Sequence, residues 1–330
     1  MQGCIRHGGG NSVKTGCAVL IAGPTASGKS ALALALAERH DGVVINADSM
    51  QIYRDLEILT ARPDAATLAR VPHRLYGILD AADPCSAGRW QRLADAEIAA
   101  AWRTGRLPIL VGGTGLYFRA LLEGLADVPP IPDALQHRIA TRLAVEGPAA
   151  LYAELRARDP LMAERLRPTD SQRVARALAV VLATGRSLAE FQEAGKTGLP
   201  KAGRKMRPLK WVLDSPRDAL YRRIDARFLG MMERGALDEV RRLLARGLDP
   251  GLPAMKAIGV PPLRALIAGR ISREEAIRRA QQDSRRYAKR QMTWLRTQAA
   301  DWPRLAADDM KKAMATIDAA LAAPATGGQD

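Results

Sequence analysis

The chain has 330 residues, 47% of them hydrophobic, which suffices to bury the core of one large domain with an insertion or of two modest domains. No stretch approaches the roughly 18 consecutive apolar residues that a membrane helix needs, and residues 1–15 lack the apolar run of a secretory signal, so we expect a cytoplasmic protein without a membrane partner. The formal net charge is +15, and because residues 1–128 carry 13 Lys and Arg against 12 Asp and Glu, nearly all of the surplus follows them, which favours a nucleic-acid partner.

The first predicted element is a buried strand, Cys17–Ala22, and a helix of strong helix formers is predicted at Ala31–His40. Between them lies a glycine-rich segment with the residues Gly23, Pro24, Thr25, Ala26, Ser27, Gly28, Lys29 and Ser30. Strand, glycine-rich turn and helix in this order predict a P-loop, in which backbone amides bind phosphate oxygens, Lys29 neutralises their charge and the Ser30 hydroxyl can ligate Mg²⁺. The loop by itself indicates a bound nucleotide, such as ATP, or another pyrophosphate.

Alternating strands and helices continue the chain and indicate a parallel α/β sheet. Further buried strands are predicted at Val43–Ala47, Leu75–Leu79, Leu107–Val111 and Leu209–Leu213. The helical stretches between them include Arg89–Arg103 and Leu116–Leu125. We therefore expect an α/β fold with a P-loop NTPase-like parallel sheet core flanked by helices, formed by residues 17–128 and 205–323, with flexible tails at 1–16 and 324–330.

The segment between the two parts of this core, residues 129–204, has a different character. A proline cluster opens it at Val128–Pro132, and a Gly- and Lys-rich stretch closes it at Gly195–Gly203. No strand is predicted within it, and the predicted helices are Asp133–Val145, Pro148–Ala157 and Ser171–Ala183. We predict an all-helical insertion domain.

The last strongly patterned element is a helix that begins with a capping box, Ser272 followed by Glu275. Alternating spacings of three and four predict its inward side, which comprises Ile277, Ala280, Ser284, Tyr287, Gln291 and Trp294. Its other faces carry a surplus of basic residues, namely Arg273, Arg278, Arg279, Arg285, Arg286, Lys289, Arg290 and Arg296. Because an ordinary exposed helix mixes its charges more evenly, this excess favours a polyanion on the helix over a merely solvated face.

The acidic residues near the P-loop leave the reaction open. An ATP-hydrolysing P-loop protein normally has an Asp at the end of a later strand, yet the strand that ends at Val111 is followed by Gly112, Gly113 and Thr114. Asp48 follows the strand after the P-loop, where it would face an acceptor at the carboxyl edge of the sheet and could act as a general base. This predicts group transfer from a phosphorylated donor, in which either the phosphoryl group or the carbon attached to pyrophosphate moves.

Cysteine and histidine indicate no metal site of their own. The 3 cysteines lack CxxC spacing and the 4 histidines are scattered singly, so neither a disulfide framework nor a zinc site is predicted. Any metal is expected to arrive with the substrate.

Four motifs occur in order along the chain. They are GPTASGKS in the P-loop, NADSMQIYRDLEILTARP at Asn46–Pro63, VGGTGLYFRALLEGL at Val111–Leu125 and RRYAKRQMTWLR at Arg285–Arg296. Together they resemble the tRNA dimethylallyltransferase family, also called tRNA isopentenyltransferases or IPP transferases. The resemblance runs from about Ala18 to Trp302. Eukaryotic members carry an appended zinc finger that this sequence does not show, so the resemblance is to the bacterial type.

The resemblance implies transfer of a dimethylallyl group from dimethylallyl pyrophosphate to the exocyclic amine of the adenosine immediately 3′ of the tRNA anticodon. Pyrophosphate leaves, Mg²⁺ is required and ATP is not consumed. By match to the family's motifs, Asp48 takes a proton from the amine, Thr25 contacts the bridging oxygen and Arg227 holds the pyrophosphate. These roles are chemically sensible, because negative charge grows on the leaving group and is stabilised by positioned donors and a metal.

The resemblance also implies tRNA contacts in both the core and the insertion. Because the adenine must leave its stack to reach a closed channel, base extrusion is expected. The matching positions are Asp48, Ser49, Met50, Gln51, Thr114, Gln136, Gln172, Arg173, Val174, Ala175, Arg176, Lys256, Ala257, Ile258, Gly259, Val260 and Pro261. The last segment departs from the family, since Val260 follows Gly259 where a Gly-Tyr pair is common, and an aromatic contact is lost.

Three alternatives remain open from the residues themselves. Prenyl transfer to free adenosine nucleotides uses a similar core but needs neither the insertion nor the basic helix. A P-loop small-molecule kinase is allowed by the loop and Asp48, although the missing carboxylate after Val111 counts against it. A non-catalytic RNA-binding protein would leave the P-loop without a purpose, so the favoured hypothesis is a monomeric tRNA-modifying transferase.

Overall fold

The computed structural model describes residues 16–194, 196–197 and 206–323. The predicted tails, apart from Gly16, and most of the predicted Gly- and Lys-rich stretch lie outside the described residues. The chain divides into two compact units, of which one comprises Met1–Leu121 with Pro200–Asp330 and the other Leu122–Leu199. Within the described ranges, no helix is long and apolar enough to cross a membrane.

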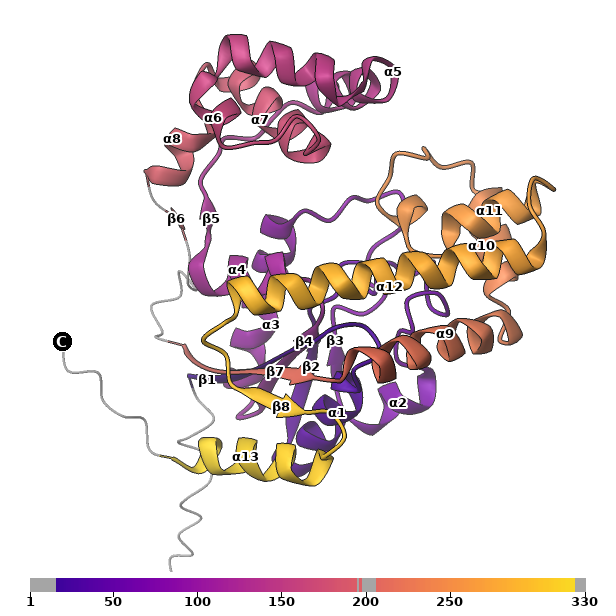
Figure 1. The fold of residues 1–330 in the computed structure, drawn as a ribbon. Helices are drawn as coiled ribbons and strands as arrows, with labels where there is room; N and C mark the ends of the chain where they lie inside the picture. The colour runs from indigo at the N-terminus through magenta and orange to yellow at the C-terminus, as the bar shows by residue number, and fades with distance from the viewer. Residues whose placement is uncertain (1–15, 195, 198–205, 324–330) are drawn as a thin grey trace, which may run out of the picture. The chain divides into compact units, whose positions relative to one another are not determined.

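A six-stranded parallel sheet forms the centre of the first unit (Figure 1). Its strands, in spatial order, are β3 (His73–Arg74), β2 (Gly42–Asn46), β4 (Leu107–Gly112), β1 (Cys17–Ala22), β7 (Arg207–Asp214) and β8 (Arg304–Ala306). The register pairs Val19 of β1 with Ile109 of β4 and with Leu209 of β7. All residues of β1, β2 and β4 are buried, as is typical of parallel strands covered on both faces. The predicted parallel α/β core is confirmed.

Helices cover both faces of this sheet. The helices of this unit are, in chain order, α1 (Lys29–His40), α2 (Ala65–Arg70), α3 (Ala87–Arg103), α4 (Gly115–Glu123), α9 (Arg217–Glu233), α10 (Ala236–Ala245), the 3-10 turn η1 (Ala254–Lys256), α11 (Val260–Ile267), α12 (Arg273–Gln298) and α13 (Met310–Ala322). The chain moves from β1 out to β2 and back to β4, so right-handed crossovers place α1 and α3 on opposite faces. α1 and α13 share a hydrophobic cluster with β1, β4 and β7. Trp90 and Trp102 of α3 donate indole N–H bonds to the carbonyls of Asn46 and Cys17, both at 2.8 Å.

The edge of the sheet differs from the prediction. A strand is predicted at Leu75–Leu79, but β3 ends at Arg74, and the prediction is wrong. Leu75 and Gly77 have φ of 65° and 61°, and this left-handed backbone cannot continue an extended strand. Leu79 keeps one isolated parallel bridge, to Tyr53. The other edge strand, β8, has no counterpart among the predicted strands.

The described residues of the second unit form helices and one short two-stranded ribbon. Its helices are α5 (Asp133–Arg158), α6 (Pro160–Glu164), α7 (Ser171–Thr184) and α8 (Leu188–Glu193), and they enclose a hydrophobic cluster of their own. A break at Gly147, with φ 80°, followed by Pro148, divides α5 into halves that match the two helices predicted there. Leu125–Ala126 (β5) and Lys196–Thr197 (β6) pair antiparallel, an addition to the all-helical insertion that the sequence predicts.

The basic helix α12 begins at the predicted cap. Ser272 Oγ accepts a hydrogen bond from Glu275 N at 3.2 Å. The Glu275 carboxylate forms ion pairs with Arg278 and Arg279, both at 2.5 Å. It therefore pairs with two arginines of the next helical turn. The predicted inward side is confirmed at its centre, where the buried residues include Ala280, Ser284 and Gln291.

Candidate active site

The P-loop follows β1 at the carboxyl edge of the sheet and turns tightly into α1. Ala26 and Gly28 have φ of 63° and 92°, and Ser27 N donates to Pro24 O at 3.3 Å. Left-handed backbone is strained for alanine, and such strain gathers at binding sites. Lys29 Nζ donates to Pro24 O at 3.1 Å, so the ammonium group folds back over the loop. The strand, turn and helix predicted from the sequence are all present.

Asp48 follows β2 at the same edge of the sheet. Asn46 braces the backbone around it, because Asn46 Oδ1 accepts from Asp48 N at 2.8 Å and Asn46 Nδ2 donates to Leu75 O at 3.0 Å. Asp48 Oδ1 accepts from Met50 N at 2.9 Å. The second carboxylate oxygen has no hydrogen-bond partner among the described residues, and a general base requires such an oxygen.

Helices α9 and α12 bring two side chains onto the P-loop. Arg227 of α9 donates to Thr25 Oγ1 at 2.5 Å, so two of the predicted catalytic residues are in direct contact. Gln291 of α12 accepts from Thr25 N at 2.9 Å and donates to Gly113 O at 3.0 Å. Gln291 thus links the P-loop to the residues after β4, a role that the sequence did not reveal. The only feature of the sequence that could have indicated this role is the polar amide of Gln291 on the predicted inward side of α12.

The ends of β2 and β4 approach each other closely. A Cβ at Gly112 would lie 2.0 Å from Ala47 O, so only glycine fits there. Just beyond, Thr114 Oγ1 accepts from Ser49 N at 3.0 Å, and Thr114 N donates to Ala47 O at 3.2 Å. The structure therefore brings together Ser49 and Thr114, two of the positions predicted to contact RNA.

A cavity of about 320 Å³ lies among these elements. The predicted catalytic residues that line it are Thr25, Asp48 and Arg227. The predicted RNA contacts that line it are Ser49, Met50, Lys256, Ala257 and Ile258. Apolar side chains that the sequence did not single out complete much of the wall, and they include Leu59, Ile224, Phe228 and Met231. This combination of cationic and apolar groups suits a ligand that is charged at one end and hydrocarbon at the other.

Two cationic side chains at the P-loop, Lys29 in the loop and Arg227 at the cavity wall, are partly removed from water. Desolvation lowers the pKa of Lys29 to about 8, with Asp48 opposing and Arg227 adding to the effect. Burial also lowers the pKa of Arg227, again opposed by Asp48. Burial together with the charge of Asp48 raises the pKa of Tyr287 above its usual value. A bound anion would favour the charged forms of Lys29 and Arg227, so the electrostatics favours phosphate groups here.

The remaining predicted RNA contacts have different surroundings. Gln51 Nε2 donates to the carbonyls of Thr60 and Ala61, at 2.9 and 3.2 Å, within its own loop. Gly259 has φ 96° and precedes α11. Val260, the first residue of α11, is buried and is not exposed to an RNA ligand. Exposed positions from this set are Pro261 and, in the second unit, Gln136, Gln172, Arg173 and Arg176, whereas Val174 is buried and Ala175 is half-buried.

The residues present fit a magnesium ion that is held mainly by phosphate. No group of three or more His, Cys, Asp or Glu could hold a metal ion within residues 16–194, 196–197 and 206–323. The exposed Ser30 hydroxyl at the first turn of α1 is an oxygen ligand of the kind Mg²⁺ accepts. Ser27 Oγ is buried in the loop without a hydrogen-bond partner among the described residues.

Replacing Gln291 with leucine should lower the free energy of unfolding by about 1–3 kcal/mol, because Thr25 N and Gly113 O lose their partner in a half-buried site. Urea unfolding measures the change. The matched control is Gln298→Leu, on an exposed position of the same helix, which should stay within about 0.5 kcal/mol of the parent. Equal unfolding midpoints for the two variants would contradict the bridging role.

Comparison with known proteins agrees with this geometry. A family model described as IPP transferase matches residues 51–298, and one described as Isopentenyl transferase matches residues 17–82. The chain is 56% identical over 282 residues to the tRNA dimethylallyltransferase of Rhodospirillum rubrum, covering 85% of each chain. It is 56% identical over 300 residues to the tRNA dimethylallyltransferase of Methylobacterium sp. (strain 4-46), covering 90% of this chain and 96% of the relative.

Solved structures of similar proteins extend the agreement to the fold. The tRNA isopentenylpyrophosphate transferase of Bacillus halodurans superposes with a TM-score of 0.66 at 33% identity, over 93% of this chain and 97% of that one. A eukaryotic dimethylallyltransferase acting on tRNA superposes with a TM-score of 0.77 at 28% identity, over 95% of this chain and 82% of that one. The chain belongs to the IPP transferase family, whose relatives are the tRNA dimethylallyltransferases.

Proposed function

We propose that this protein transfers the dimethylallyl group of dimethylallyl pyrophosphate to the exocyclic amine of the adenosine immediately 3′ of a tRNA anticodon and releases pyrophosphate. The observation that carries the proposal is the contact between Arg227 and Thr25 at the wall of a cavity that Asp48 also lines. A phosphate loop, a candidate base and an apolar wall are what this transfer needs in one place. The names of the relatives support tRNA as the acceptor.

In the proposed reaction, the P-loop amides, Lys29 and Arg227 bind the pyrophosphate. The amine nitrogen forms a bond to the first carbon of the allylic group as the bond from that carbon to the pyrophosphate oxygen breaks. Asp48 takes the proton that the amine loses, on the carboxylate oxygen not used by Met50. Thr25, held by Arg227, lies where it can contact the departing oxygen. The apolar wall excludes water from the allylic carbon.

We propose Mg²⁺ as the cofactor, held by the Ser30 hydroxyl and by the pyrophosphate oxygens. When bound, the ion supplies positive charge to the leaving group. A small protein ligand set is consistent with this arrangement, because Mg²⁺ commonly takes most of its ligands from substrate phosphate and water. Removal of the ion with a chelator is expected to stop transfer without unfolding the protein.

The exposed face of α12 supports an RNA acceptor. Several of its arginines are paired within the protein, as Arg285 is with Asp225 and Arg286 with Asp283. Its exposed basic residues also include Lys289, Arg290 and Arg296, and Arg290 lines the cavity. We propose that a monomer acts in the cytoplasm, where tRNA is used.

The direct test incubates the protein with radiolabelled dimethylallyl pyrophosphate, Mg²⁺ and unmodified tRNA that reads codons beginning with U. Label is expected in the tRNA, and unlabelled tRNA would refute the proposal. Parallel reactions offer AMP as the acceptor, or ATP with formation of ADP as the readout. Label in AMP alone would favour prenyl transfer to free nucleotides, and acceptor-dependent ADP would favour a kinase.

Binding of inorganic pyrophosphate should weaken as the pH rises through the pKa of Lys29, about 8, because the ammonium form binds the anion. Below that pH Lys29 is charged and adds no pH dependence of its own, and the protonation of pyrophosphate itself affects the parent and a Lys29 variant alike. Above it, the dissociation constant should rise by up to about tenfold per pH unit until the pKa of the complex is reached. Titration calorimetry between about pH 7 and about pH 10 measures this. The Lys29→Met variant has no charge on this side chain at any pH, so it should bind pyrophosphate more weakly and lose the part of the rise in dissociation constant that Lys29 causes. An equal rise with pH in the parent and the variant would assign the rise to another titrating group.

A further inference from the structure

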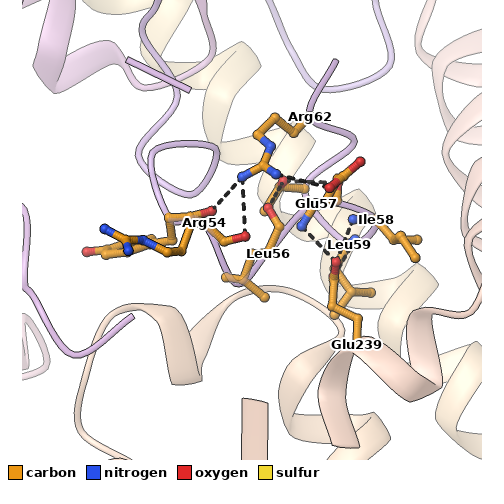
Figure 2. Close-up of polar contacts among 9 residues, drawn as sticks. Arg54, Leu56, Glu57, Ile58, Leu59, Arg62 and Glu239 are labelled. Atoms are coloured by element: carbon orange, nitrogen blue, oxygen red, sulfur yellow. Dashed lines mark hydrogen bonds and ion pairs between the residues drawn. The ribbon is translucent and has the colours of Figure 1, made fainter. Parts of the chain in front are cut away.

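Glu239 of α10 is a buried carboxylate with an unusual set of partners. Its exposed fraction is 3%, and it accepts hydrogen bonds from three successive backbone N–H groups. Oε2 lies 2.7 Å from the nitrogens of Glu57 and Ile58, and Oε1 lies 3.0 Å from the nitrogen of Leu59 (Figure 2). A buried charge is costly unless its hydrogen bonds are complete, and here the backbone of one turn supplies them.

The turn held by Glu239 forms part of the cavity wall. Leu59 and Thr60 line the cavity. Leu59 also packs against Gly259, where a Cβ would lie only 2.7 Å from Leu59 Cδ2. The carbonyl of Thr60 accepts from Gln51 Nε2 at 2.9 Å. The turn therefore touches two segments predicted to contact RNA, one at Gln51 and one at Gly259.

Other contacts close the loop that carries this turn, but they lie farther out. Arg62 donates to the carbonyl of Tyr53 at 3.1 Å. It also pairs with the Glu57 carboxylate at 3.0 Å (Figure 2). Arg246, which follows α10, pairs with Asp55 and Asp80 at 2.5 and 2.6 Å. These ion pairs are partly exposed, so water and salt screen them. The carboxylate of Glu239 is the buried anchor of the loop.

The donor side of the cavity is braced by different residues. Gln291 and Arg227 hold Thr25, and Asn46 holds Asp48. None of these hydrogen bonds involves Glu239 or the turn. The loss of Glu239 should therefore disturb the acceptor side while leaving the pyrophosphate site in place.

We propose that Glu239 is a positioning residue for the RNA acceptor: it fixes the turn of residues 57–60 and, through that turn, the orientation of Gln51 and the cavity wall at Leu59. This inference rests on the proposed function for its kinetic consequence. The hydrogen bonds themselves can be tested without the reaction.

The test is Glu239→Gln, which keeps the shape of the side chain but turns one acceptor into an N–H₂ group that faces a backbone N–H. The KM for tRNA should rise about tenfold. Leu59 is only one of several apolar residues of the cavity wall, and other residues hold the pyrophosphate site, so kcat and the KM for dimethylallyl pyrophosphate should change by no more than about threefold. Amide hydrogen exchange of the peptide covering residues 57–60 should become faster in the variant. If the KM of the donor rises as much as that of tRNA, or if neither the exchange nor the KM for tRNA changes, the proposal is overturned.

Two further variants separate positioning from a general loss of stability. Val240→Ala opens a cavity beside Glu239 on α10, at a side chain with 0% exposure, without removing an acceptor from the turn. It should leave the KM for tRNA unchanged, and an equal rise would overturn the proposal. Glu239→Asp retains the charge but has a shorter side chain that cannot reach the three backbone N–H groups equally well. It should therefore raise the KM for tRNA and speed the exchange of residues 57–60, and it serves as the test if Glu239→Gln does not fold. A parental KM and parental exchange in Glu239→Asp would overturn the proposal. Failure of the parent protein to label tRNA would refute the proposed function, while the exchange measurement would still decide whether Glu239 holds the turn.

Discussion

Replacing Asp48 with alanine should lower the single-turnover rate of prenyl transfer by about a thousandfold, within the range typical for loss of a general base. The amine nitrogen must lose a proton as it bonds to the allylic carbon, and Asp48 is a carboxylate at the cavity wall with one oxygen not engaged by Met50. The affinity for tRNA should change little, because one side chain among many RNA contacts is removed. Rapid-quench assays with labelled donor measure the rate, and filter binding measures the affinity.

Two variants make this prediction sharper. Asp48→Asn keeps the shape of the side chain and an oxygen for Met50 N, so the loop should stay in place, yet the amide cannot take the proton. Its rate should fall about as far as that of the alanine variant. Asp308→Ala, which removes an exposed carboxylate, should retain activity within about twofold of the parent. A parental rate in Asp48→Asn would remove Asp48 from the role of base.

Replacing Arg227 with alanine should reduce kcat/KM for dimethylallyl pyrophosphate by about a hundredfold to a thousandfold, the range seen when one donor to a developing negative charge is removed. Arg227 is partly buried and donates to Thr25 Oγ1 in the P-loop, so the substitution removes both its charge and its contact beside the leaving group. The dissociation constant for tRNA should stay within about threefold of the parent. Steady-state kinetics with each substrate varied separately provides the comparison.

The contact with Thr25 allows a further check on Arg227. Because the two side chains touch, Thr25→Val and Arg227→Ala should be less than additive when combined. Arg222→Ala removes the same charge from an exposed position of α9 and serves as the matched control, with the donor KM expected to be parental. If the donor KM responds equally to both arginines, the effect is one of overall charge and the assigned contact is wrong.

Local patterns in the sequence were sufficient to predict the core and one edge of the site. Strand, glycine-rich turn and helix follow one another at Cys17–His40, so the P-loop could be recognised from neighbouring residues alone. Asp48 could be placed beside it because the carboxyl ends of parallel strands meet at one edge of the sheet. The positions of Thr25, Asp48 and Arg227 were predicted by family resemblance, and the structure brings them to one cavity.

Other features depend on residues that are distant in the chain. The strand expected at Leu75–Leu79 reads as apolar and extended, but the left-handed backbone at Leu75 turns the chain there, and local propensity does not encode that turn. The sequence pattern placed Gln291 on the inward side of α12, yet its hydrogen bond to the P-loop joins residues 266 positions apart. Tertiary packing alone decides such contacts.

Glu239 shows most clearly which contacts cannot be predicted from the sequence. In the sequence it is one of two adjacent acidic residues on an amphipathic helix, where exposure would be expected. In the folded chain, its carboxylate is buried against the amides of a turn some 180 residues earlier. The sequence by itself was sufficient to predict the P-loop, the parallel sheet and the family, because each depends on patterns of residues that are close together in the chain. Only the tertiary structure decided which helices complete the cavity and which buried side chains hold its walls, because hydrogen bonds between distant segments form only when the whole core has packed.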